Sequence, residues 1–401
     1  MSIPIAVRIT GPLVPHVDGF YAELMALGYT PLSAIMQLRL MAHVSRWLES
    51  HRRRLHELTP QQADQFLRAR KRAGYVGWLT ARALMPLLAY LRRLGVAPWP
   101  PPGTRNAVER LVALYRDHLN RERGLSPKSI DLYEPLALRF LTERFPSGRP
   151  EPARLTAADI TRFVPSECHG RALSHAKFIV TALRSLLRFL YIRGWTKAPL
   201  AAAVPAVASW RLASLPRPVE PEHVVRLLRS CDRRTAGGRR AYAILLLLVR
   251  LGLRASEVCA LRLEDVDWRS GELLVHGKGG RQEKLPLPSD VGEALAAYLR
   301  RDRPDVADRV FFLRRFAPIR ALTRVAVRHV VGLACARAGL APFGAHRLRH
   351  TAATEMLRRG APLSVIAQVL RHRSTESTAI YAKVDRGALR ALALPWPGVE
   401  S

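Results

Sequence analysis

The first half of the chain carries the periodicity of amphipathic helices, and the pattern occurs twice. Apolar residues recur at helical spacing in residues 81–95 and again in residues 177–194, and both stretches end in glycine. The recurring residues are Leu84, Leu87, Leu88 and Leu91 in the first stretch, and Leu183, Leu186, Leu187 and Leu190 in the second. An earlier helix-start signal, a hydroxyl residue followed by proline, also occurs twice, at Thr30-Pro31 and Ser126-Pro127. Equivalent signals lie about 96 to 99 residues apart, which favours a duplicated all-helical domain over a chance similarity of two small bundles.

Two proline-rich segments interrupt these patterns. Residues 97–103 contain four prolines and residues 197–221 contain five, and proline removes the backbone donors that a helix needs. The segments predict three blocks. The blocks are an N-terminal helical domain at 1–100, a second helical domain at 104–196 and a third domain at 215–401.

The third block mixes two periods. Residues 221–231 and 241–251 have helical spacing, and the pattern is helical again from residue 323. Between them, residues 271–276 and 281–287 are short strand-like runs joined by a glycine-rich turn, which predicts a β-hairpin. The expected fold is mainly α, with N-terminal helical bundles followed by a mostly α domain that holds a small antiparallel sheet.

Charge points to the kind of partner. The chain has 64 Lys and Arg against 32 Asp and Glu, a formal net charge of +32 and a pI near 11.4. Hydrophobic residues make up 48%, which is too many for a disordered chain. A folded protein this basic is expected to bind a polyanion, and nucleic acid fits because each neutralised phosphate releases counterions.

Cysteine usage and hydropathy indicate the compartment. The four cysteines are far apart, which argues against a disulfide framework or a zinc knuckle and fits a reducing environment. The N-terminal residues lack the pattern of a secretory signal, and the longest apolar run, 241–249, is about half a membrane span. We therefore expect a cytoplasmic protein with no membrane partner.

Six polar residues of the third block form a candidate catalytic set. Arginine binds phosphate oxygens through a planar fork and keeps its proton, so a pair of arginines suits a phosphodiester in transit. A tyrosine hydroxyl can attack phosphorus when a base or a positive field assists it, histidine can carry a proton, and lysine can protonate a leaving alkoxide. The set is Arg254, Lys278, His346, Arg349, His372 and Tyr381. These side chains provide what phosphoryl transfer to a protein hydroxyl requires without a metal or other cofactor. Because the phosphotyrosine ester conserves the energy of the bond, the strand can be rejoined without ATP.

The spacing of these residues resembles the catalytic domain of the tyrosine recombinase family, also called phage integrases. The likeness lies in Gly252 to Val258, in Gly277-Lys278-Gly279, in His346 to His350 and in Leu370-Arg371-His372 with Tyr381. The resemblance implies that Arg254 and Arg349 clamp the scissile phosphate and that Lys278 is the acid. It also implies that His346 and His372 handle protons and that Tyr381 forms a 3′-phosphotyrosyl link.

The resemblance extends to the second block, which is similar to the family's helical core-binding domain. It implies double-stranded DNA with inverted-repeat sites as partner. It also implies a homo-tetramer, or a mixed recombinase assembly, on two duplexes during integration or excision of a mobile element. The residues after Tyr381 would pack against a neighbouring subunit or fold back on their own domain.

Two departures from the family pattern stand out. Arg371 replaces the usual glycine before the last histidine, and the block at 1–100 resembles a second core-binding bundle that would grip more DNA or dock a partner recombinase.

Three other functions remain to be weighed. A zinc hydrolase could use His346 and His350 as metal ligands. However, the three residues between these histidines include two arginines and no glutamate that could act as a base. A type IB topoisomerase uses similar chemistry. A DNA-binding factor with an inactive recombinase domain is the third.

Overall fold

A computed structural model describes residues 7–99, 106–208, 218–277 and 281–371, together with Thr378 and Tyr381. Residues 99–211 form one compact unit, and residues 1–98 with 212–401 form the other. Three separate hydrophobic cores lie in residues 13–97, 108–204 and 219–348.

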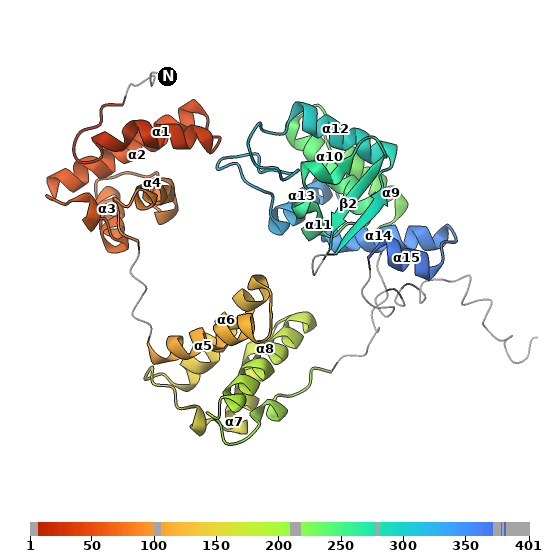
Figure 1. Ribbon diagram of the computed structural model, residues 1–401, viewed down its shortest axis with the longest axis horizontal. Helices are drawn as coiled ribbons and strands as arrows, with labels where there is room; N and C mark the ends of the chain where they lie inside the picture. The colour runs from red at the N-terminus through yellow and green to blue at the C-terminus, as the bar shows by residue number, and fades with distance from the viewer. Residues whose placement is uncertain are drawn as a thin grey trace, which may run out of the picture. The chain divides into compact units, whose positions relative to one another are not determined.

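The N-terminal part of the chain is helical (Figure 1). Its elements are η1 (Val14–His16), α1 (Val17–Ala26), α2 (Pro31–Ser50), η2 (Leu55–Glu57), α3 (Pro60–Arg72) and α4 (Ala81–Arg93). Thr30 caps α2 and Thr59 caps α3, each accepting a hydrogen bond from a backbone N–H in the first turn. The leucines predicted to recur on one face of α4 are buried.

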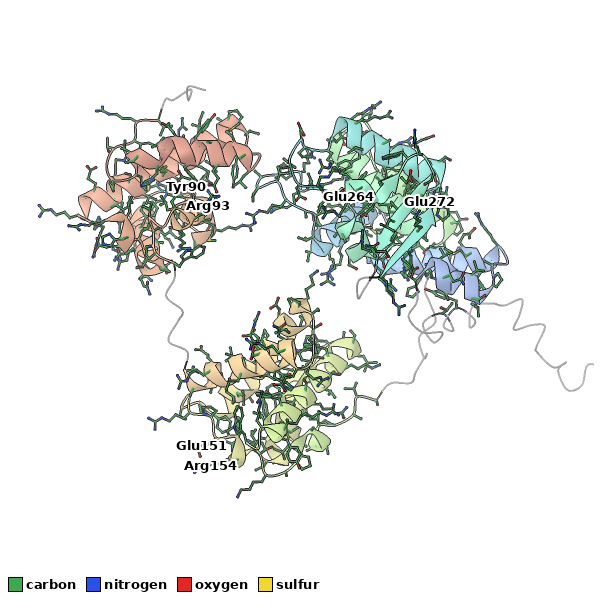
Figure 2. All side chains as sticks on the ribbon, viewed as in Figure 1. Tyr90, Arg93, Glu151, Arg154, Glu264 and Glu272 are labelled. Carbon is green, nitrogen blue, oxygen red and sulfur yellow. The ribbon has the colours of Figure 1, made fainter. Side chains whose placement is uncertain are left out.

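Residues 106–208 repeat this arrangement (Figure 1). The elements are α5 (Ala107–Arg121), α6 (Pro127–Arg144), η3 (Pro152–Arg154), α7 (Ala157–Cys168), α8 (Leu173–Ile192) and η4 (Leu200–Ala203). Ser126 and Thr156 cap α6 and α7 as Thr30 and Thr59 cap α2 and α3. Figure 2 labels Glu151 and Arg154 in this part, and their ion pair, 2.7 Å long, is exposed.

Buried positions of the two helical parts correspond at the predicted offset. The pairs of buried residues are Val44 and Phe140, Phe66 and Phe163, Leu87 and Leu186, and Leu91 and Leu190. The glycines that end α4 and α8, Gly95 and Gly194, have φ of 72° and 70°, the left-handed conformation that glycine adopts without strain. The two parts therefore share helix order, caps and the positions of core residues.

The third part is mostly α with a small sheet. Its helices are α9 (Pro221–Arg229), α10 (Ala236–Arg250), α11 (Ala255–Ala260), η5 (Leu263–Asp265), α12 (Ser289–Arg301), α13 (Arg324–Arg337), α14 (Ala345–Arg358) and α15 (Leu363–Val369). Residues 244–248 of α10 are almost completely buried, and α10 packs against α12, α13 and α14. The mainly α fold with a small antiparallel sheet is confirmed.

The sheet contains the predicted hairpin. Strands β2 (Glu272–His276) and β3 (Gln282–Pro286) pair antiparallel, with Leu273 opposite Leu285. A third strand, β1 (Val266–Asp267), pairs with β2 and was not predicted, because two residues are too short to show a period. No helix among the described residues is long and apolar enough to cross a membrane.

Candidate active site

Helix α14 places three polar side chains of the candidate site on one face. His346, Arg349 and His350 are three and four residues apart, so they neighbour one another on the helix surface. The two histidine rings meet edge to face, with centroids 4.5 Å apart. Among the described residues, no group of three His, Cys, Asp or Glu side chains is arranged to hold a metal ion.

Arg349 is buried, with 1% of its surface exposed. Its Nη1 donates to the Gly252 carbonyl over 2.6 Å, and its Nη2 donates to the Leu370 carbonyl. Gly252 has φ of 58°, and a Cβ there would lie 2.6 Å from the Leu370 side chain, so this position favours glycine. Two segments far apart in the sequence thus meet at this guanidinium.

Arg254 precedes α11 and lies close to Arg349 in the same cluster. Its Nη1 donates to Glu257 Oε1 over 2.6 Å, and its backbone N–H donates to Glu257 Oε2 over 2.8 Å. About a third of its side chain is exposed, whereas Glu257 is buried. Arg254 is therefore held both at its backbone N–H and at its guanidinium, while part of the side chain remains open to solvent.

Burial and neighbouring positive charges lower the pKa values of two residues in this cluster. Burial, and then the charge of Arg254, lowers the pKa of Arg349 to about 10. Burial followed by the charges of Arg349 and Arg254 also lowers the pKa of His346 below its usual value. Arg349 stays protonated at neutral pH and His346 is neutral, so the cluster presents fixed positive charge beside an uncharged ring.

Tyr381 packs into a small apolar cluster next to α14. It is 1% exposed and contacts a group formed by Ala353, Ile366 and Leu370. Its hydroxyl lies 2.8 Å from His350 Nδ1. Burial raises the pKa of Tyr381, although the charge of Arg349 opposes this. The phenol is therefore protonated at neutral pH and needs a proton acceptor.

His350 has the properties of such an acceptor. Burial, then His346 and Arg349, lowers the pKa of His350 to about 4. A ring with this pKa is neutral at physiological pH and carries a lone pair on one nitrogen. Sequence reasoning considered His350 only as an alternative zinc ligand, and the signal for its other role is its position one helical turn after His346.

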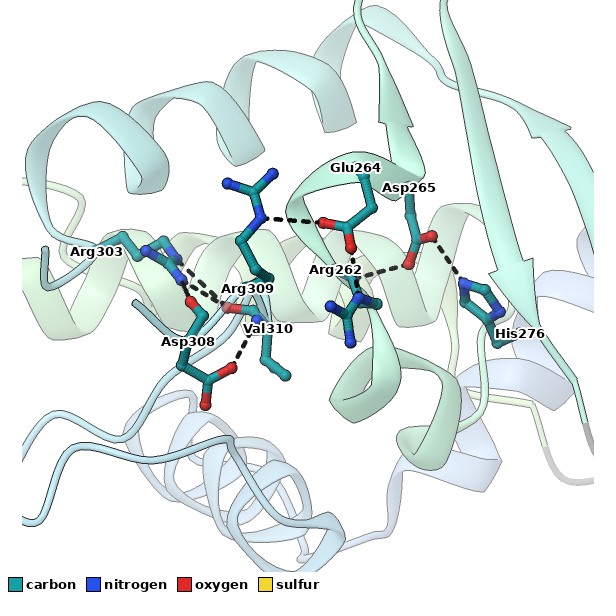
Figure 3. A network of polar contacts seen from close by, with 8 residues as sticks. All are labelled: Arg262, Glu264, Asp265, His276, Arg303, Asp308, Arg309 and Val310. Atoms are coloured by element: carbon teal, nitrogen blue, oxygen red, sulfur yellow. Dashed lines mark hydrogen bonds and ion pairs between the residues drawn. The ribbon is translucent and has the colours of Figure 1, made fainter. Parts of the chain in front are cut away.

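The end of β2 nearest the hairpin turn is held by a separate polar network (Figure 3). The buried carboxylate of Asp265 accepts hydrogen bonds from the Arg262 backbone N–H over 2.8 Å and from His276 Nε2 over 2.7 Å. His276 ends β2, two residues before Lys278 in the sequence. The network continues from Glu264 to Arg309, whose Nε lies 3.5 Å from the carboxylate.

The structure brings together four of the six predicted site residues. These are Arg254, His346, Arg349 and Tyr381, which influence one another's ionisation. Lys278 and His372 lie outside the described residues.

Comparison with known proteins decides the family. The model of the phage integrase family matches residues 217–387. The integrase/recombinase y4rA of Sinorhizobium fredii is 44% identical over 393 residues, which cover 97% of this chain and 95% of the relative. This chain belongs to the phage integrase family of tyrosine recombinases. Tyrosine recombinase XerD of Mycobacterium tuberculosis is 33% identical over 305 residues, 71% of this chain and 95% of XerD.

Solved structures of recombinases share the fold. The XerH recombinase bound to a palindromic difH substrate has a TM-score of 0.57 at 19% identity and covers 83% of this chain and 94% of its own. The lambda integrase dimer bound to a COC′ core site has a TM-score of 0.54 at 18% identity and covers 73% and 98%. The chain is thus a site-specific tyrosine recombinase, an enzyme that transfers DNA strands, and neither a topoisomerase nor an inactive DNA-binding factor is favoured.

Proposed function

We propose that this recombinase cuts and rejoins DNA through Tyr381, in the integration or excision of a mobile element. The observation that carries the proposal is the approach of the Tyr381 hydroxyl to within 2.8 Å of a neutral His350, next to the buried Arg349. A nucleophile, a proton acceptor and fixed positive charge are what phosphoryl transfer to a phenol requires.

The first step follows from these groups. Tyr381 Oη attacks the scissile phosphorus, and His350 accepts the phenol proton. The bond from phosphorus to O5′ breaks, a 3′-phosphotyrosyl ester forms, and the leaving oxygen takes a proton from Lys278. Because Tyr381 is buried, attack requires that it move toward the phosphate when DNA binds.

Positive charge stabilises the transition state of this step. Arg254 is partly exposed and binds the non-bridging oxygens directly. Arg349 donates two of its N–H groups to backbone carbonyls and so holds its charge in a fixed place. His346 and His372 donate hydrogen bonds to the phosphate and relay protons. Rejoining reverses these steps with a 5′-hydroxyl from the partner strand, and no ATP is consumed.

Covalent trapping tests the nucleophile. Wild type and Tyr381→Phe are incubated with nicked duplexes from both flanks of the protein's own gene and run on denaturing gels. Wild type should form a DNA–protein adduct, and Tyr381→Phe should lose at least about a thousandfold of the adduct rate while binding the same DNA. Tyr191→Phe, which changes a tyrosine that is 45% exposed on α8, is the matched control and should behave as wild type.

Either of two results would contradict the proposal. An adduct that persists in Tyr381→Phe assigns the nucleophile to another residue. Specific binding without any wild-type adduct assigns the chain to DNA binding alone.

The domain organisation completes the proposal. We assign residues 104–196 to a core-binding domain, residues 215–401 to the catalytic domain, and residues 1–100 to a duplicate of the core-binding domain. The shared helix order, caps and buried positions of the two helical parts support the duplication. The N-terminal duplicate would hold additional DNA, since residues 1–98 contain thirteen Lys and Arg against five Asp and Glu.

Assembly on DNA is proposed from the neighbours. XerH was captured on a palindromic substrate and lambda integrase as a dimer on its core site. By analogy, this recombinase binds inverted-repeat duplex DNA and assembles as a tetramer on two such duplexes in the cytoplasm.

A further inference from the structure

Arg371 occupies a backbone position that favours glycine. It follows the last turn of α15, where its N–H donates to the Gln368 carbonyl over 2.9 Å, and its φ is 55°. A side chain in this left-handed region is strained, and glycine is the residue that relieves the strain. Most described residues with positive φ in this chain are glycines, and the family's pattern also has glycine at this place.

The Arg371 side chain points into the protein and pairs with a buried acid. Only 7% of the residue is exposed, and its Nη2 lies 2.9 Å from Glu257 Oε2. Its Nη1 donates to the Val369 carbonyl over 2.7 Å, which keeps the guanidinium against its own turn. A buried ion pair must be well bonded to offset the cost of removing both charges from water.

Glu257 connects Arg371 to Arg254. One carboxylate oxygen receives the Arg254 guanidinium, and the other receives the Arg254 backbone N–H and the Arg371 guanidinium. Although burial alone would raise it, the pKa of Glu257 is lowered, first by the charge of Arg371 and then by the hydrogen bonds from Arg254. The acid is therefore ionised and shared between two arginines.

The backbone at the same turn contacts both arginines that we assign to the phosphate. Arg254 Nη2 donates to the Arg371 carbonyl over 3.2 Å, and Arg349 Nη2 donates to the Leu370 carbonyl. The position of this turn thus sets the position of both guanidinium groups. The side chain of Arg371 ties the turn to Glu257 on α11.

Charge balance gives the second consequence. Without Arg371, the charge of Glu257 would balance that of Arg254, and Arg349 would be the one uncompensated charge of the group. With Arg371, three arginines face one carboxylate, so the net charge of these four residues is +2 instead of +1. The transition state of phosphoryl transfer carries more negative charge than the ground state, so added fixed charge favours it.

We propose that Arg371 is a positioning residue for strand cleavage: it anchors the Leu370–Arg371 turn to Glu257 and offsets that carboxylate's charge, so that Arg254 stays fixed and its charge is not compensated beside the scissile phosphate. The inference rests on the proposed function, in which Arg254 and Arg349 bind that phosphate.

The substitution Arg371→Gly tests this role because it removes the ion pair while relieving the strained backbone. On the nicked duplex that wild type cleaves, we expect Arg371→Gly to form adduct 10- to 100-fold more slowly, with DNA affinity within about twofold of wild type. Arg371→Lys, which keeps the charge, should recover part of the rate. Arg359→Gly is the control, since it removes an arginine whose ion pair, with Glu355 at the end of α14, is exposed, and it should cleave as wild type.

A neutral phosphate separates this role from a merely structural one. A methylphosphonate at the cleavage site removes one negative charge, so it reduces the need for positive charge. The defect of Arg371→Gly should shrink to less than about threefold on this substrate, whereas a distorted fold would slow both substrates equally. In Glu257→Gln protein, removal of Arg371 should also cost less than in wild type, because the two residues act together.

Three results would overturn the inference. The first is an Arg371→Gly protein that cleaves as fast as wild type. The second is an equal defect on the phosphate and methylphosphonate substrates. The third, no adduct from wild type on any flank, would overturn the proposed function and with it this inference, and it differs from the others because wild type itself is inactive.

Discussion

At the scale of single residues, the contact between His350 and Tyr381 joins helix α14 to the proposed nucleophile. The ring nitrogen and the hydroxyl are 2.8 Å apart. Burial and the nearby His346 and Arg349 lower the pKa of His350, so its ring is neutral. A base of low pKa is a weak acceptor in water. In the proposed step, Tyr381 moves toward the positive charge of Arg254 and Arg349. That charge lowers the pKa of the phenol and so makes transfer of its proton to His350 easier.

This pairing predicts the pH dependence of cleavage. With a pKa of about 4, the His350 ring stays neutral as the pH falls from 7.5 to 5.5, whereas a histidine of ordinary pKa near 6.5 would lose about tenfold of its neutral form. We expect the rate of adduct formation to change by less than about threefold over this range on account of His350. The check is single-turnover trapping across the pH series.

His350→Asn supplies the comparison for that profile. It should slow adduct formation about 100-fold at every pH, because the proton acceptor is removed, while the shape of the profile stays the same. An acidic limb near pH 6.5 that is present in wild type and absent from His350→Asn would show that His350 has an ordinary pKa and would refute the assignment.

At the scale of elements, the hairpin depends on one buried carboxylate. Asp265 joins the end of β2 to the turn before β1 through His276 and the Arg262 backbone (Figure 3). Because His276 lies two residues before Lys278 in the sequence, loosening this junction should affect the proposed acid, Lys278, more than it affects DNA affinity.

His276→Ala is therefore expected to slow cleavage about 10-fold at unchanged DNA affinity. A substrate with sulfur at the 5′ bridging position should cancel the defect, since a thiolate leaves without a proton. Lys284→Ala on β3, which breaks only the exposed pair with Glu272, is the matched control and should cleave normally. If the defect of His276→Ala were equally large with the sulfur substrate, the hairpin junction would not act through Lys278, the proposed acid.

At the scale of the whole molecule, two helical parts share one design but differ in surface. Many of their core positions correspond, whereas the exposed face of α3 has cations that the end of α7 lacks: Arg68, Lys71 and Arg72 correspond to Pro165, Cys168 and His169. A retained core with a changed surface preserves the fold and alters what the bundle binds.

This difference predicts the role of the N-terminal part. In the full chain, replacing Arg68, Lys71 and Arg72 with alanine should weaken DNA binding. It should also reduce the slope of log affinity against log salt by about 0.9 for each phosphate that the variant no longer neutralises. Gln61→Ala with Gln65→Ala, exposed and uncharged on the same helix, is the control. An unchanged slope, measured by titration over a salt series, would contradict DNA binding by this helix.

Much of the architecture follows from the sequence alone. Periodic leucines and hydroxyl-proline caps predicted the helices of both bundles, because a helix face must bury its apolar residues and an N-terminus must satisfy its free N–H groups. The glycine-rich turn between two short apolar runs predicted the hairpin. The spacing of the motifs also indicated the family and the candidate nucleophile, although not which side chains touch.

Only the tertiary structure decided which residues distant in sequence contact one another. Glu257 and Arg371 are 114 residues apart, and His350 and Tyr381 are 31 apart, so no local period reports that they meet. The sequence marked Arg371 only as a departure from glycine, and it could not show whether the side chain faces solvent or a buried acid. Periodicity records which face of an element is apolar, but the pairing of charges depends on how separate elements pack, and that is fixed only when the chain folds.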